Sequence, residues 1–101
     1  MNIVVAGFDW DLGNRTKCQK HGLTIYEIER FFLGEVEILS DPKHSQEEDR
    51  FIAVGRALNG RPVVVGFTFR TKGGETLLRP ISARYMHLKE VLKYEKATSK
   101  T

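Results

Sequence analysis

The stretch from Phe8 to Gly22 constrains the fold most, because it holds a helix start, a basic helix and a helix end in close succession. Asp11 is suited to the N-cap of a short helix, where a carboxylate accepts backbone N–H groups at the positive end of the helix dipole. Gly22 supplies the left-handed conformation that ends such a helix. Between these positions only Leu12 and Cys18 are apolar side chains, so the pattern predicts a thin buried stripe and a wide cationic surface.

A second helix is predicted from Ile25 to Leu33. Thr24 and Glu27 have the spacing of a capping box, in which each side chain bonds the backbone of the other residue. Leu23 and Ile28 occupy the two positions of a hydrophobic staple. The apolar residues that follow recur with helical spacing, so one face of this helix is expected to lie in the core.

The remainder of the chain reads as strands followed by a helix. Alternating or β-branched runs bounded by turn residues indicate strands, and a last apolar stripe indicates a helix. The class is therefore α+β, an antiparallel sheet with two N-terminal helices and a C-terminal helix packed on it. The predicted strands are Ile3–Trp10, Val36–Leu39, Phe51–Leu58, Pro62–Phe69 and Thr76–Arg84, and the last helix is Tyr85–Lys96.

An Asn-Gly pair at 59–60 is typical of a two-residue type I′ hairpin turn. Such a turn places Val54 opposite Val65, on a face that meets the helices. If residues 71–75 form the next loop, Ile81 also lies opposite Val65 and extends this apolar face.

The same register sends Arg70 and Arg84 to the opposite, open face of the sheet, together with Leu78 and Pro80. Because proline lacks a backbone N–H, the strand that contains Pro80 is expected to be an edge strand or to have a bulge there. In this register Arg79 falls on the apolar face, and its charged group must reach the margin of that face.

A chain of 101 residues forms one domain, predicted to span residues 1–96 with a frayed tail at 97–101. No apolar segment approaches the roughly 20 residues that cross a bilayer, and the first seven residues lack the features of a signal peptide. We therefore expect a cytoplasmic protein with no membrane partner. Cys18 is the sole cysteine, which excludes an internal disulfide; it is either a small buried residue or a thiol nucleophile.

Charge is unevenly distributed along the chain. Residues 35–49 are rich in Asp and Glu, whereas residues 50–96 contain ten of the sixteen Lys and Arg residues. The basic half is a candidate nucleic-acid surface, although ordinary solvated surfaces also show such imbalance. His44 lies near Asp41 and Glu48 in the sequence, but no second histidine is close, so no metal or other cofactor is predicted.

The ordered set of short motifs resembles the BrnT family of type II toxins, small relatives of the RelE/ParE toxins. Each motif is weak alone, and their order and spacing carry the resemblance. The matching pieces are Phe8-Asp9-Trp10-Asp11, Lys20-His21-Gly22, Phe32, Asp41-Pro42, His44-Ser45, Glu48-Asp49-Arg50, Gly55, Gly60-Arg61, Ile81-Ser82-Ala83-Arg84, Glu90 and Tyr94-Glu95.

The resemblance implies a RelE-like fold and an endoribonuclease that cleaves mRNA, free or on the ribosome, and so inhibits translation. It also implies a BrnA-type ribbon-helix-helix antitoxin that neutralises the toxin and alone contacts operator DNA. An alternative is a non-catalytic binding module of the same fold that acts with its antitoxin in operon repression. Three positions depart from the common family pattern: Asn14, Cys18 and Pro80.

Metal-free RNA cleavage needs a base for the 2′-hydroxyl, a cation for the phosphate and an acid for the leaving oxygen. His21 is the predicted acid or base, and Arg84 and Arg70 the predicted phosphate contacts. Each also has a structural interpretation. His21 suits a helix C-terminus, and the arginines could pair with Glu75, Glu90 or an antitoxin carboxylate. The predicted RNA-binding residues are Lys20, Arg15, Lys17 and Tyr94.

Overall fold

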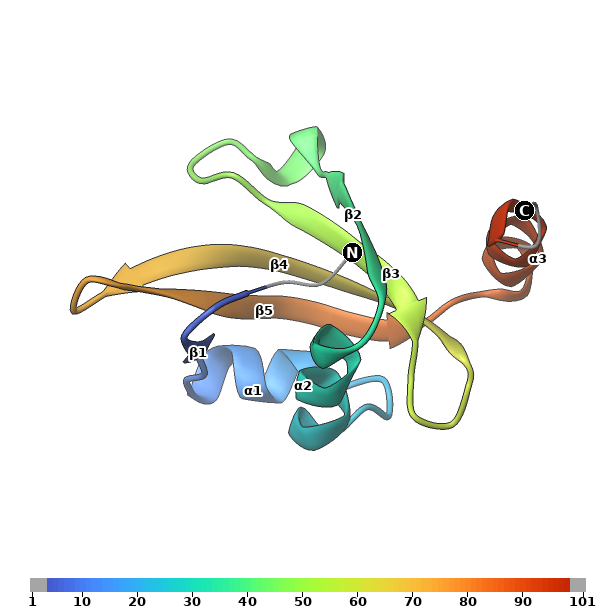
Figure 1. Ribbon diagram of the computed structural model, residues 1–101, viewed down its shortest axis with the longest axis horizontal. Coiled ribbons are helices and arrows are strands. Elements are labelled where there is room, and N and C mark those ends of the chain that lie inside the picture. The colour runs from blue at the N-terminus through green and yellow to red at the C-terminus, as the bar shows by residue number, and fades with distance from the viewer. Residues whose placement is uncertain (1–3, 99–101) are drawn as a thin grey trace.

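The computed structural model describes residues 4–98 and shows a mixed α+β fold built on a five-stranded sheet (Figure 1). The strand order is β1-β5-β4-β3-β2, and all neighbouring pairs are antiparallel except β1 and β5, which are parallel. The strands are β1 (Gly7–Phe8), β2 (Val36–Ser40), β3 (Phe51–Arg56), β4 (Pro62–Lys72) and β5 (Glu75–Tyr85).

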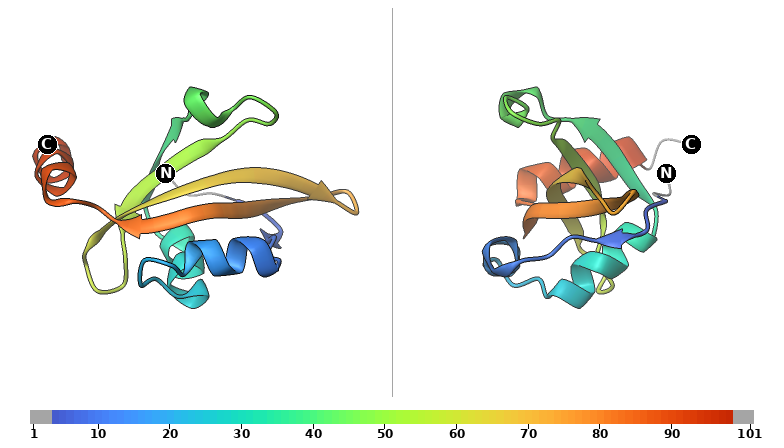
Figure 2. Two further views of the ribbon diagram at one scale, coloured as in Figure 1. Left: turned by 180° about the vertical axis from the view of Figure 1, so that it is seen from behind. Right: turned by 90° about the vertical axis from the view of Figure 1, so that its left-hand side faces the viewer.

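Two helices, α1 (Leu12–Cys18) and α2 (Ile25–Leu33), cover one face of the sheet, as the views in Figures 1 and 2 agree. Both begin as the sequence predicts. The backbone N–H of Asn14 donates to Asp11 Oδ1, and Thr24 and Glu27 form a complete capping box. The bounds predicted for α2 are confirmed.

The core lies between these helices and the inner face of the sheet. Phe32 of α2 meets Phe67 of β4 edge-to-face, with ring centroids 5.2 Å apart. Ala53, Val65 and Ala83 follow one another across three strands and are almost fully buried. Neither α1 nor α2 lies over the other face of the sheet, which we call the open face (Figure 2).

The predicted packing of the C-terminal helix on the sheet is wrong. This helix, α3 (Leu88–Thr98), begins three residues later than predicted, stands apart from α1 and α2 beyond the end of β5, and has no buried residue (Figure 1). Its apolar residues are too few to hold it on a sheet, and Leu88 and Leu92 are largely exposed. Helix α3 continues through Ala97 and Thr98, and the rest of the predicted frayed tail lies outside the described residues.

The predicted register of the first hairpin is also wrong, by one residue. Val54 lies opposite Val64, and Ala53 opposite Val65, because Ala57 pairs with Arg61 and leaves a three-residue loop. Only Gly60 has a positive φ, of 83°, so the Asn-Gly pair does not form the two-residue type I′ turn. A three-residue loop closed by a left-handed glycine is the other common hairpin connection. Each β3 side chain therefore lies on the face of the sheet opposite to the one predicted.

The second hairpin turns at Gly73-Gly74 and not over the five residues predicted. Both glycines have positive φ, as a type I′ turn requires. The ladder has a bulge at Ile81, with Phe67 opposite Pro80 and Gly66 opposite Ser82, so the expectation of a bulge at this proline is confirmed. The bulge reverses the predicted facing of the first part of β5. Leu78 and Pro80 are buried in the core.

Near the N-terminus the predicted strand Ile3–Trp10 is reduced to β1, and its first residue lies outside the described part. Helix α1 ends at Cys18, before the predicted end near Gly22. Its buried residues are Cys18 and Asn14, whereas Leu12 is 83% exposed. Within residues 4–98 no helix is long and apolar enough to cross a membrane.

Candidate nucleic-acid interface

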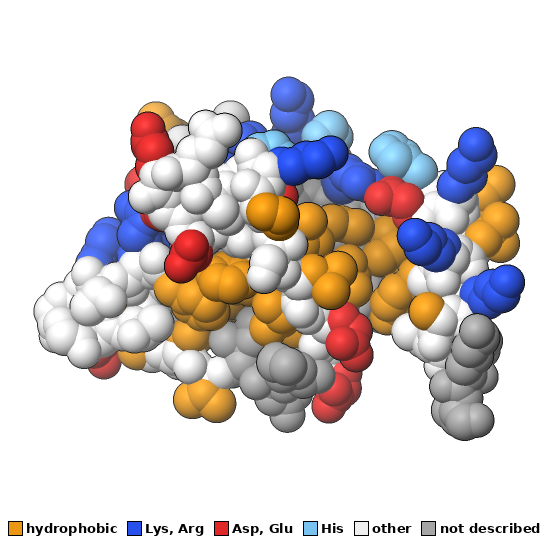
Figure 3. Space-filling model, turned by 90° about the horizontal axis from the view of Figure 1, so that it is seen from above, with side chains coloured by type: hydrophobic (Ala, Val, Ile, Leu, Met, Phe, Trp, Pro, Cys, Tyr) orange, Lys and Arg blue, Asp and Glu red, His pale blue; other side chains and the backbone are white. Residues whose placement is uncertain are grey.

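Three depressions adjoin one another: one lies in the segment between β2 and β3, and the other two lie on the open face of the sheet and along its β5 side. Figure 3 shows this face from above, with Lys, Arg and His side chains bordering an apolar strip. The central depression, of about 280 Å³, is lined by Lys17 of α1, by Arg84 of β5 and by the segment between β2 and β3. That segment contains a short 3-10 helix, η1 (Pro42–His44), and the loop that leads to β3.

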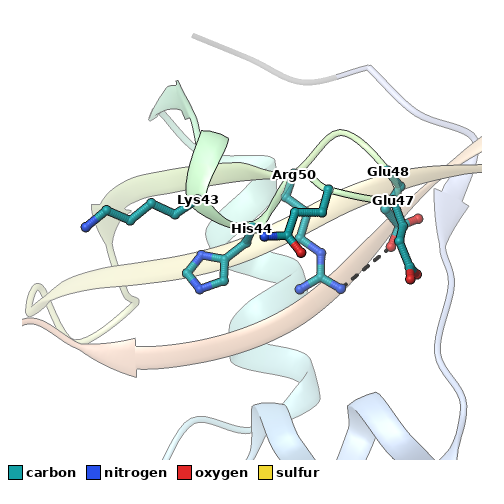
Figure 4. A pocket seen from close by; sticks show the side chains of 6 residues that line it. Lys43, His44, Glu47, Glu48 and Arg50 are labelled. Atoms are coloured by element: carbon teal, nitrogen blue, oxygen red, sulfur yellow. Dashed lines mark ion pairs between the residues drawn. The ribbon is translucent and has the colours of Figure 1, made fainter.

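Arg50, which precedes β3, lines all three depressions and so lies at their junction. Figure 4 shows its side chain beside that of His44, and its ion pair with Glu48 is drawn as a dashed line. That pair is long, at 3.8 Å between Nη2 and Oε1. Arg50 is not among the site residues predicted from the sequence. Its position at the end of an acidic loop, within the Glu48-Asp49-Arg50 motif, was the available signal.

Arg84 extends from the open face of β5 toward the start of α3. Its Nη1 and Nη2 donate to the two carboxylate oxygens of Glu90 at 2.7 and 3.0 Å. Glu90 also accepts the backbone N–H of His87. The Arg84 hydrogen bonds are the main reason that the pKa of Glu90 falls to about 2, and Glu90 in turn raises the pKa of Arg84. The bidentate geometry that binds this carboxylate also suits a phosphate.

Arg70 lies on β4, on the open face as predicted, and lines the depression beside α1. Its Nε donates to Glu48 Oε2 at 3.2 Å. The two predicted phosphate-binding arginines therefore share a face, and each has a carboxylate partner. Of the partners weighed from the sequence, Glu90 is found on Arg84, whereas Arg70 pairs with Glu48, which the sequence analysis had not weighed.

A partly buried ionic cluster connects the start of α1 to β5 next to these depressions. Arg79, with its side chain 17% exposed, contacts Asp9 Oδ2 at 3.4 Å and Asp11 Oδ2 at 2.9 Å. Lys72 Nζ donates to the other oxygen of Asp9 at 2.8 Å, and this bond is the main cause that lowers the pKa of Asp9. The prediction that Arg79 falls on the apolar face is wrong, because Arg79 lies opposite Thr68, on the same face of the sheet as Arg70. Its guanidinium pairs there with the two acidic residues at the start of α1.

His44 closes the η1 turn and lines two of the depressions. Its Nδ1 lies 2.8 Å from Asp41 Oδ2. Backbone hydrogen bonds fix the position of Asp41: the Asp41 N–H donates to the carbonyl of Arg50, and the Asp41 carbonyl accepts from Ser45 Oγ. From the sequence, the only chemistry weighed for His44 was metal binding.

The other predicted site residues are distributed around these depressions. Lys17 lines two of them, and Lys20 lines a shallow hollow beside Lys17 on α1. His21 and Arg15 are exposed, and neither lines any of these depressions. Tyr94 is half-buried on α3, under the guanidinium of Arg56 at 5.5 Å.

The described residues do not favour catalysis by a cysteine nucleophile or by a bound metal ion. Cys18 is fully buried, and burial raises the pKa of its thiol to about 11, so it is a core residue and not a thiolate nucleophile at neutral pH. Among residues 4–98 no group of three or more His, Cys, Asp or Glu side chains is placed to hold a metal ion.

Comparison with known protein families identifies one match that covers most of the chain. Residues 10–90 match the family described as the ribonuclease toxin, BrnT, of type II toxin–antitoxin systems. The matched range includes α1, strands β2 to β5 and the start of α3, and thus every side chain that lines the depressions. No curated protein matches the chain.

Proposed function

We propose that this chain, which belongs to the BrnT family of ribonuclease toxins from type II toxin–antitoxin systems, cleaves mRNA without a metal ion and thereby inhibits translation. Membership of that family brings an antitoxin partner. We further propose that this antitoxin is a BrnA-type ribbon-helix-helix protein, which neutralises the toxin and makes the contact with operator DNA. We also propose that the fold has a RelE-like arrangement.

The observation that carries the proposal is the convergence of four cations from four segments of the chain. Lys17 of α1, Arg50 before β3, Arg70 of β4 and Arg84 of β5 line depressions that share the Arg50 side chain. Three of the four are arginines, whose planar guanidinium groups bind phosphate oxygens in pairs. An RNA backbone laid over the junction would meet cationic groups on several sides.

Such a surface suits RNA because RNA contains its own nucleophile. The 2′-hydroxyl attacks the adjacent phosphate, so the protein must supply only proton transfer and stabilisation of the charge that develops on phosphorus-bound oxygens. Fixed guanidinium groups at the phosphate provide that stabilisation without a metal ion.

One specific observation favours the alternative, a non-catalytic binding module that acts with its antitoxin in operon repression. Arg70 and Arg84 are both occupied by carboxylates, Glu48 and Glu90. A module that only binds an acidic antitoxin segment needs cations of this kind and no proton-transfer group. The two functions differ in one measurable respect, the cleavage of RNA.

The deciding experiment expresses the protein alone and together with the product of the neighbouring gene. We expect growth arrest in the first case and normal growth in the second, and we expect the purified protein to cut mRNA in the presence of a chelator. Assays are run with and without ribosomes. A folded protein that cuts no RNA under either condition would favour the binding module.

Arg50→Ala tests the junction directly. We expect cleavage to fall about a hundredfold, the loss of roughly 2 to 4 kcal/mol seen when one donor to a transition-state oxyanion is removed. Arg61→Ala is the matched control, because it removes the same charge from an exposed loop outside the depressions, where Arg61 stacks on Tyr85. Equal cleavage by the two variants would exclude Arg50 from the site.

The remaining assignments made from the sequence stay predictions. They are tested by single substitutions of His21, Lys20, Arg15 and Tyr94, each compared with the unmodified protein for RNA affinity and for cleavage rate. A folded His21→Gln protein that binds RNA normally and cuts it slowly would support a part for His21 in the reaction.

A further inference from the structure

His44 is the one histidine of the three, all within the described residues, that lines these depressions. It shares the central depression with Lys17, Arg50 and Arg84. Its side chain is 65% exposed, so the imidazole is accessible to a large substrate. Figure 4 shows the ring directed away from η1 into the space beside Arg50.

The orientation of the ring is fixed by Asp41. A carboxylate is only an acceptor, so the 2.8 Å contact with Oδ2 places a hydrogen on Nδ1 of the neutral imidazole. Nε2 is then the nitrogen with a free lone pair, on the opposite side of the ring. The same contact stabilises the imidazolium that forms when Nε2 gains a proton, which is the role an aspartate has in other Asp–His pairs.

The loop that holds this pair is anchored at several points. The Asp41 N–H donates to the Arg50 carbonyl at 2.9 Å, and Ser45 Oγ accepts the N–H of Arg50 at 3.0 Å. Ser45 Oγ also donates to the Asp41 carbonyl. The backbone of Arg50 and the Asp41–His44 pair therefore belong to one hydrogen-bonded turn, which brings a base and a phosphate-binding cation to the same depression.

We propose that His44 is the general base of RNA cleavage and that Asp41 is its positioning residue, an inference that rests on the proposed function. Nε2 takes the proton of a ribose 2′-hydroxyl, and the 2′-oxygen forms a bond to phosphorus. The bond from phosphorus to the 5′-oxygen breaks, and that oxygen takes a proton from solvent water. The products are a 2′,3′-cyclic phosphate and a free 5′-hydroxyl, and His44 returns its proton to solvent.

The test compares His44→Gln with His87→Gln, a control at an exposed histidine outside the depressions. Cleavage is measured in a single turnover, and affinity is measured with RNA whose 2′-hydroxyls are methylated. We expect His44→Gln to slow cleavage by about 10²- to 10⁴-fold, the usual contribution of a general base, with affinity changed less than twofold. Because His44 is exposed, its replacement should leave the melting temperature unchanged.

Wild-type cleavage together with unimpaired cleavage by His44→Gln would overturn the role of His44 and leave the ribonuclease proposal intact. Absence of cleavage by the folded wild-type protein would overturn both. A substrate with sulfur in place of the 5′-bridging oxygen separates base from acid, because a thiolate leaves without a proton. The ratio of wild-type to His44→Gln rates should be the same on this substrate, and a ratio near one would make His44 the acid.

Asp41→Asn tests the positioning role with a spectroscopic readout. An asparagine amide can donate to Nδ1, which moves the ring hydrogen to Nε2 and removes the free lone pair from the side facing RNA. Nitrogen-15 shifts of the imidazole should show the Nδ1–H tautomer in the wild-type protein and the Nε2–H tautomer in Asp41→Asn, with slower cleavage at equal RNA affinity. An unchanged tautomer in a slow variant would contradict the proposed role of Asp41.

Discussion

Asn14 donates a hydrogen bond from Nδ2 to the backbone carbonyl of Pro80 at 2.8 Å, which joins helix α1 to the bulged part of strand β5. The same nitrogen donates to the carbonyl of Asp9 at 3.0 Å, and Asn14 Oδ1 accepts the N–H of Asp11. The side chain is buried, with 5% of the residue exposed. Asn14 and Pro80 thus contact each other, and Asn14 has a structural role.

Replacing Asn14 with alanine should destabilise the protein by about 2 to 3 kcal/mol. The change removes bonds to two carbonyls in a buried site, and a buried acceptor left without a donor costs on the order of 1–3 kcal/mol. The free energy of unfolding is measured with denaturant. Gln19→Ala, directly after the same helix, is the control, because the Gln19 side chain donates to the Arg15 carbonyl in an exposed position. Equal losses in the two variants would contradict this interpretation.

The helices on the sheet were predictable from the sequence because their signals are local. A capping box or an Asp N-cap is formed by residues three positions apart, so the bounds of α2 and the start of α1 follow from adjacent residues. Strand registers were predicted less well. An Asn-Gly pair fits both a two-residue and a three-residue loop, and the choice depends on which β3 residues fill the core. In the observed register Gly55 faces the core, where an added Cβ would lie 3.0 Å from the Glu35 carbonyl, so a glycine at this position suits the second choice.

The candidate site was predictable only in part, for a related reason. Alternation along β4 and β5 placed Arg70 and Arg84 on one face, and the structure agrees. Arg50 and His44 come from the segment between β2 and β3, where no periodicity applies, and only tertiary contacts bring them to the same depression. The place of a residue along a loop does not show which way its side chain points.

The two faces of β4 should respond differently to a carboxylate. Val65 is fully buried between Ala53 and Ala83, so Val65→Asp places an unpaired charge in the core and should unfold the domain. Val64 points to the open face and lines the central depression, so Val64→Asp should retain a cooperative melting transition. Thermal melts followed by circular dichroism check both variants. Comparable melting temperatures would refute the assignment of faces.

The Asp9 ion pairs should make stability depend on pH in the acid range. The Lys72 hydrogen bond, with further contributions from Lys72 and Arg79 charge, lowers the pKa of Asp9 below its ordinary 3.8. A group with a lowered folded-state pKa stabilises the protein above its unfolded-state pKa and loses that contribution as pH falls through the folded-state value. Asp9→Asn should therefore be clearly less stable than wild type at pH 6, and the difference should shrink below pH 3.8. A difference independent of pH would contradict this.

Glu90→Gln should increase the affinity of the protein for RNA, because it removes the carboxylate that occupies the Arg84 guanidinium. Exposed ion pairs are worth about 0.2–1 kcal/mol, so we expect a gain of about two- to fivefold. Glu95→Gln is the matched control, since it removes the same charge from the same helix but releases Arg56 and not Arg84. With the pKa of Glu90 at about 2, mild acid leaves its carboxylate ionised, and the pair with Arg84 is lost only as the pH falls to about 2. Affinity is measured with 2′-O-methylated RNA at fixed salt concentration. Equal gains in affinity in the two variants would mean that only the net charge of the protein matters. A gain confined to Glu90→Gln would identify Arg84 as a phosphate contact.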